Sequence, residues 1–125
     1  MAKPLKGYLI EALWNWCTDS GKSPYLAIKV DDDCRVPEAF VTDGQIVLDI
    51  SDEAVRGLAF DDEGVSFEAR FGEAALACFA PYPNIIGAFP SDNPPEGLFF
   101  PFEKSATKVQ KIRRPRLRQR PAFLV

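Results

Sequence analysis

The residues that most often perform catalysis are scarce in this chain. It contains no histidine, and its three cysteines, Cys17, Cys34 and Cys78, have neither metal-ligand spacing nor a neighbouring base. It also lacks a glycine-rich phosphate loop and a GxSxG motif. We therefore expect no enzymatic activity, no cofactor and no bound metal.

Two acidic runs, residues 31–33 and 61–63, are the remaining candidate ligand set, in this case for a cation. Calcium prefers carboxylate and carbonyl oxygens. Acidic side chains are also common at solvated turn tips, because they form hydrogen bonds to their own backbone. We interpret both runs as exposed turns.

Charge is instead concentrated at the C-terminal end. Residues 103–125 hold eight Lys or Arg against the single acid Glu103, a net +7, whereas residues 1–102 hold seven bases against 17 acids, a net −10. A basic stretch repels itself and buries little apolar surface, so it usually stays unfolded. We expect one domain over residues 1–102 and a flexible tail over residues 103–125 that ends in an apolar tip.

The chemistry available to this chain is therefore recognition, and the recognition surface must be positioned by one small core. No run of 18 or more apolar residues occurs, and the first segment contains Glu11 where a signal peptide would be apolar. The three cysteines are too widely spaced to suggest a disulfide framework. We expect a cytoplasmic protein with reduced thiols and no membrane contact.

A helix is predicted over residues 8–19, where apolar side chains fall at helical spacing. They form two stripes: Leu9, Leu13 and Trp16 on one, and Ile10, Trp14 and Cys17 on the other. A single flat sheet covers only one stripe, so the surplus suggests an interface with a partner chain at Ile10, Trp14 and Cys17. The alternative is a helix enclosed by its own chain. Gly21 and Pro24 end the helix.

Beyond residue 24 the apolar spacing changes to a period of two, which is typical of strands. Asp43 and Gly44 predict a tight type I′ hairpin between residues 38–42 and 45–50. Further strands are predicted at residues 25–30, 58–60, 65–71, 74–79 and 98–100, with helical turns at residues 51–54 and 83–88. One helix and five or six short strands indicate a mainly β (α+β) protein with a small, partly open barrel.

Several segments, in order, resemble the stringent starvation protein B (SspB) family. They include SPYL at residues 23–26, DGQIVLDI at residues 43–50, Ala54-Val55, and VxFxARFG at residues 65–72. The resemblance implies an Sm-like or SH3-like barrel that dimerises through its N-terminal helix. It also implies an adaptor that binds the ssrA degradation tag and delivers tagged proteins to the protease ClpXP. The zinc in that system belongs to the N-terminal domain of the unfoldase ClpX.

An extended peptide is best held at a strand edge, where main-chain hydrogen bonds give affinity and side-chain pockets give selectivity. The resemblance places this groove beside two segments. We carry the site to Phe40, Val41 and Thr42 before the hairpin, and to Phe67, Glu68, Ala69 and Arg70, with the small Ala69 leaving room for peptide backbone. The alternative is that the aromatic residues only fill the core.

The resemblance also implies that the end of the tail docks on ClpX. Two stretches come close to the family motif of Arg-Pro, a small or variable residue, Leu, a base, two aliphatic residues and Lys. The favoured copy is the terminal one, formed by Arg120, Pro121, Ala122, Phe123, Leu124 and Val125. The alternative copy consists of Arg114, Pro115, Leu117 and Arg118.

A rival interpretation is an RNA-binding or ribosome-associated Sm-like protein that uses the basic tail to contact phosphates. The net −10 of residues 1–102 opposes it, since this body would repel nucleic acid. The tail also lacks the interleaved aromatic residues that stack on bases, with Phe123 the only one after Phe102. We therefore favour peptide recognition.

Overall fold

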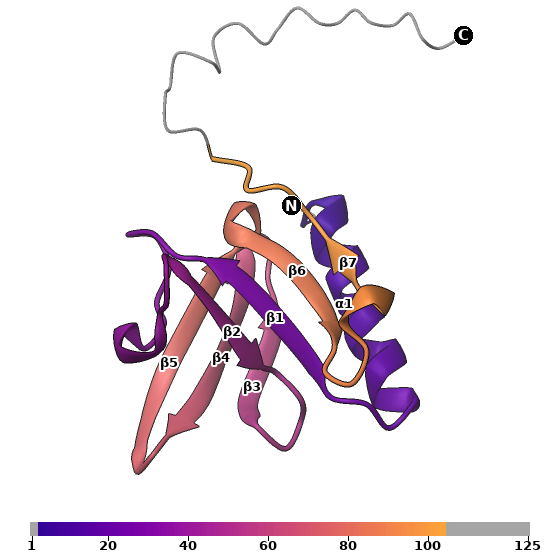
Figure 1. Ribbon diagram of the computed structural model, residues 1–125, viewed down its shortest axis with the longest axis horizontal. Coiled ribbons are helices and arrows are strands. Elements are labelled where there is room, and N and C mark those ends of the chain that lie inside the picture. Colours follow the sequence, from indigo (N-terminus) through magenta and orange to yellow (C-terminus); the bar gives the residue numbers. More distant parts are fainter. Residues whose placement is uncertain (1–2, 105–125) are drawn as a thin grey trace, which may run out of the picture.

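The computed structural model describes residues 3–104, which form one helix and seven strands (Figure 1). The elements, in order, are α1 (Leu5–Asp19), β1 (Pro24–Lys29), β2 (Gln45–Asp49), β3 (Val55–Phe60), β4 (Gly64–Phe71), β5 (Ala74–Pro81), β6 (Ile85–Pro90) and β7 (Leu98–Phe99). Short 3-10 turns occur at Glu38–Phe40, Tyr82–Asn84 and Pro94–Glu96.

The strands form two antiparallel sheets, with orders β2-β1-β6-β7 and β3-β4-β5 (Figure 1). A single bridge between Arg35 and Phe79 joins the segment after β1 to β5. The result is the predicted small, partly open barrel-like fold with an N-terminal helix. It has one strand more than the upper number predicted.

The core lies between the two sheets and the inner face of α1. The strand alternation produces it directly: Leu26 and Ile28 on β1 and Ile46 and Leu48 on β2 are buried, while Val47 is exposed. On β4 the alternate residues Val65, Phe67 and Ala69 are buried, as their spacing predicts. None of the helices within residues 3–104 is long and apolar enough to cross a membrane.

Helix α1 begins at Leu5, three residues earlier than predicted, and ends at Asp19 as predicted. Gly21 adopts a φ of +73°, and the Lys22 N–H donates to the Cys17 carbonyl oxygen at 2.8 Å. This is the glycine-based helix end that the sequence indicates.

Placing the dimer interface at Ile10, Trp14 and Cys17 is wrong for two of these residues. Ile10 and Cys17 are fully buried in the core of their own chain, so they offer no surface to a second chain. Trp14 is half-buried, and its Nε1–H donates to the Ile50 carbonyl oxygen at 2.8 Å. The exposed apolar side chains of α1 lie on the other side, at Leu5, Tyr8, Leu9 and Trp16.

The turn at Asp43 and Gly44 has the predicted geometry, with positive φ angles of 54° and 76°. Its first arm is not the predicted strand, because residues 38–40 form a 3-10 turn and only Thr42 bridges Gln45. β2 pairs instead along β1, with Leu26 opposite Leu48. The competing segment lacks alternation, since Glu38, Ala39 and Phe40 are consecutive exposed residues.

The helical turn predicted at residues 51–54 forms, with the Ala54 and Val55 N–H groups donating to the Ser51 carbonyl oxygen, but the one predicted at residues 83–88 does not. Residues 85–90 form β6, the partner of both β1 and β7, and only Tyr82–Asn84 is 3-10. The buried Ile85 and Ala88 gain more from lying inside the sheet than Pro83 gains from opening a helix. At residues 51–54 the chain makes a turn, and β3 starts directly after it, earlier than predicted.

Candidate functional site

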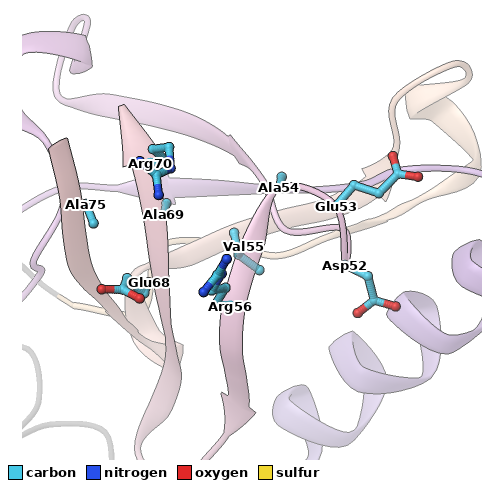
Figure 2. A pocket seen from close by; sticks show the side chains of 9 residues that line it. All are labelled: Asp52, Glu53, Ala54, Val55, Arg56, Glu68, Ala69, Arg70 and Ala75. Carbon is cyan, nitrogen blue, oxygen red and sulfur yellow. The ribbon is translucent and has the colours of Figure 1, made fainter. Parts of the chain in front are cut away.

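A groove of about 310 Å³ lies where β3 begins and β4 ends (Figure 2). We call it the β3–β4 groove. Its lining residues come from the turn before β3, the start of β3, the end of β4 and one position on β5: Asp52, Glu53, Ala54, Val55, Arg56, Glu68, Ala69, Arg70 and Ala75.

The groove exists because β4 extends two residues beyond the point at which its pairing with β3 ends. Val55 pairs with Ala69 at the start of β3, and the preceding turn leaves the sheet, with the Ala54 and Val55 N–H groups donating to the Ser51 carbonyl oxygen. Within residues 3–104 no strand continues the pairing beside Arg70 and Phe71 on this side of β4. An uncovered strand edge of this kind can pair with an extended peptide.

The floor of the groove is small and apolar, and its rim is charged. Ala54, Val55, Ala69 and Ala75 carry the shortest side chains of the lining set, so a backbone can approach closely. The rim side chains are all exposed and include both acidic and basic residues: Asp52, Glu53, Arg56, Glu68 and Arg70. No ion pair within the described residues engages any of them.

A second hollow continues the groove along the sheet. It has a volume of about 350 Å³, shares Arg56 and Glu68 with the first, and reaches Ala77 on β5. The β3–β4 register shifts between Arg56 and Ala59, and Gly57 has a φ of +63°. This bulge bends the edge strand away from simple pairing.

The predicted site residues divide between the groove and the core. Glu68, Ala69 and Arg70 line the groove. Phe67 lines only the hollow that continues the groove, and its side chain is 4% exposed and belongs to the core.

The three residues before the hairpin also lie outside the lining set. Phe40 is 58% exposed and stacks on Phe71, with ring centroids 5.5 Å apart. Val41 packs against the core and Thr42 belongs to the hairpin turn. Phe40 therefore lies near the same end of β4, on the face opposite to Arg70.

Sequence reasoning missed the contribution of the turn before β3 and of β5. These residues are Asp52, Glu53, Ala54, Val55, Arg56 and Ala75. Ala54 and Val55 were already among the segments that carry the family resemblance. Their place in the groove follows from the pairing of Val55 with Ala69, which sequence spacing does not reveal.

Ala69 has two roles that the sequence alone does not separate. It lines the groove, yet it is only 7% exposed and belongs to the core cluster. Its cross-strand neighbours are Val55 on β3 and Leu76 on β5. A larger side chain at this position would therefore strain the core as well as fill the groove.

The three thiols are free and poorly suited to act as nucleophiles. Burial raises the pKa of Cys17, of Cys34 and of Cys78, which keeps each thiol protonated near neutral pH. Burial also raises the pKa of Tyr82 to about 12. Within residues 3–104 no three acidic or cysteine side chains gather as metal ligands.

Comparison with known proteins gives one family. The sequence profile described as "Stringent starvation protein B" matches residues 4–120. The "Stringent starvation protein B homolog" of Haemophilus influenzae is 29% identical over 103 residues, which cover 82% of this chain and 69% of that protein. Since the matched range spans the helix, both sheets and the groove, the chain belongs to the stringent starvation protein B family.

Proposed function

We propose that this protein is an adaptor that binds ssrA-type degradation tags in the β3–β4 groove and delivers the tagged proteins to the ClpXP protease. The observation that carries the proposal is a small apolar floor beside an uncovered strand edge, with charged side chains that have no partner within residues 3–104. Membership of the SspB family supports it. In this role the chain performs no catalysis, and its free thiols suit a cytoplasmic location.

The groove would recognise a tag in two ways. The main chain of Arg70 and Phe71 would pair with the peptide backbone, which is independent of peptide sequence. The guanidinium groups of Arg56 and Arg70 and the carboxylate of Glu68 would select polar side chains through charge-assisted hydrogen bonds. The shallow floor would accept small apolar residues.

The tail would supply the contact with ClpX. Its two candidate docking motifs, residues 120–125 and residues 114–118, lie outside the described residues. In the terminal copy Phe123, Leu124 and Val125 would provide burial of about 1.5–3 kcal/mol for each fully buried side chain. A single tail would therefore bind weakly.

We also propose a homodimer, with the interface on the exposed face of α1. Leu5, Tyr8, Leu9, Ala12 and Trp16 recur at helical spacing and are exposed. Two linked tails would raise the apparent affinity for the unfoldase through effective concentration. Sedimentation of Leu9→Asp would detect a monomer, and an unchanged dimer would place the interface elsewhere.

Fluorescence anisotropy of a labelled ssrA peptide with the full chain tests the groove. Saturable binding is expected, with no competition from RNA. Deleting residues 120–125 should leave that binding intact and abolish enhanced degradation of a tagged substrate by ClpXP. If degradation stays enhanced, the contact belongs to residues 114–118 or the tail has no part in delivery. Binding only to RNA would support the rival function.

A further inference from the structure

A further concave surface lies at the end of the β4–β5 hairpin that is opposite to its turn. We call it the tail-root groove. It has a volume of about 530 Å³, and its apolar lining includes Phe79, Pro81 and Pro83. Acidic side chains stand at its rim: Asp33, Asp62 and Glu63.

A neighbouring hollow extends this acidic character. It shares Phe79, Asp62 and Glu63 with the tail-root groove and adds Asp61. The two hollows together carry four carboxylates and one ammonium group, that of Lys104. Among residues 3–104, carboxylates therefore outnumber ammonium groups around this apolar floor, which is the chemistry that receives a cationic, partly apolar segment.

The chain's own tail leaves the body at this rim. Lys104 lines the groove and bridges Asp31 and Asp33 at 3.0 and 2.7 Å. The Glu103 N–H donates to the Pro83 carbonyl oxygen at 3.1 Å, and its carboxylate lies 3.1 Å from Lys6 Nζ. The described chain therefore ends, at Lys104, beside the groove.

The sequence that follows has the complementary composition. Residues 105–125 contain seven Lys or Arg and no acid, and four of the seven fall within residues 113–118, where Pro115 and Leu117 lie between arginines. Arg113 lies nine positions after Lys104 in the sequence, which corresponds to a root-mean-square span of about 15–18 Å for a flexible chain. Such tethering corresponds to effective concentrations on the order of 1 mM, so even a weak contact is populated.

We propose that residues 113–118 of this chain bind back into the tail-root groove. Their guanidinium groups face the carboxylates at the rim, and Pro115 and Leu117 cover the apolar floor. The contact goes beyond the adaptor function, because it occupies one of the two candidate motifs for docking on the unfoldase. It should weaken as salt screens the charges. It needs no peptide ligand, so it stands or falls independently of tag binding.

A spin label placed in the full chain tests this contact. The label is attached at Gln119→Cys in a Cys34→Ser background, because the remaining thiols, Cys17 and Cys78, are buried. Paramagnetic broadening of backbone amides is expected at Glu63 and Phe79, and it should fall by more than half between about 0.05 and 0.5 M salt.

Charge reversal at the groove supplies the matched comparison. Glu63→Lys should remove most of the broadening, whereas Glu73→Lys, an exposed acid in the turn at the other end of the β4–β5 hairpin, should leave it unchanged. Uniform broadening, broadening centred on Arg56 and Glu68, or no response to Glu63→Lys would overturn the proposal. Broadening that appears only between mixed labelled and unlabelled chains would also overturn it.

Discussion

The cations near the tail-root groove, Lys6 and Lys104, have partners within the folded chain. The cations of the β3–β4 groove, Arg56 and Arg70, have none within residues 3–104. Within residues 3–104 all five lysines have a partner: Lys3 pairs with Glu11, Lys22 with Asp92, Lys104 with two aspartates, Lys6 with carbonyls and Glu103, and Lys29 lies over the Phe102 ring.

The arginines behave differently. Within residues 3–104 the guanidinium groups of Arg35, Arg56 and Arg70 form no hydrogen bond, ion pair or aromatic contact with one another or with other side chains. A paired cation holds structure together, whereas an exposed cation beside a hollow is available to a ligand. Two of these three arginines line the β3–β4 groove.

The largest expected effect on this contrast comes from Lys6→Met at the tail root. Lys6 Nζ donates to the Tyr82 and Ile85 carbonyl oxygens at 2.7 and 2.8 Å, and it lies 4.8 Å from the Phe100 ring centroid. Leaving buried acceptors without a donor should cost about 2–4 kcal/mol. Urea unfolding measures this loss, and peptide affinity of the folded fraction should not change.

Lys22→Met is the control for that variant, because its pair with Asp92 lies at the surface. It should leave the unfolding midpoint close to that of the parent. If Lys6→Met is equally silent, Lys6 does not fix the tail root.

The next effect separates the two roles of Ala69. Ala69→Gln should block peptide binding and also destabilise the fold by about 1–3 kcal/mol, because the side chain is overpacked into the core. Ala75 lines the same groove from an exposed position. Ala75→Gln should therefore block peptide binding with little change in stability. Anisotropy and urea unfolding on both variants distinguish these outcomes. Full affinity in Ala75→Gln would exclude β5 from the site.

A third prediction concerns the unpaired arginines. Arg70→Glu should weaken peptide binding about tenfold or more, because a charge-assisted hydrogen bond contributes about 1.5–3 kcal/mol. Stability should stay within about 0.5 kcal/mol. Arg35→Glu is the matched control, since this arginine is exposed and lies outside the groove. Equal losses from both variants would indicate a general charge effect and not a specific contact.

The smallest effect is the pH dependence of the tail root. Burial raises the pKa of Asp31, but hydrogen bonds from Lys104 and the Asp33 N–H outweigh it and hold that pKa below its ordinary 3.8. Because the folded-state pKa is the lower one, this stabilisation is present above about pH 4 and is lost as pH falls.

Asp31→Asn should therefore reduce the free energy of unfolding by under about 1 kcal/mol at pH 7, as exposed ion pairs contribute little. The difference should vanish near pH 3. Asp32→Asn removes an exposed charge from the same turn and serves as the control, with an expected free energy of unfolding at pH 7 close to that of the parent. A difference that persists in acid would assign the stabilisation to packing.

Sequence patterns succeeded where the determining interactions are local. The helix end at Gly21, the turn at Asp43 and Gly44 and the inward face of β4 depend on backbone conformation and alternation within a few residues. Three residues of the candidate groove, Glu68, Ala69 and Arg70, came from the family resemblance carried by the same strand.

Tertiary structure decided what depends on pairing between distant segments. The β3–β4 register pairs Val55 with Ala69 and ends the ladder there, which leaves the groove open. The packing of α1 against the sheets buries Ile10 and Cys17 in the core. Residues 85–90 become a strand because β1 and β7 lie on either side of them. A one-dimensional pattern specifies which side chains prefer burial, but only the folded chain specifies which neighbours bury them and which edges remain open.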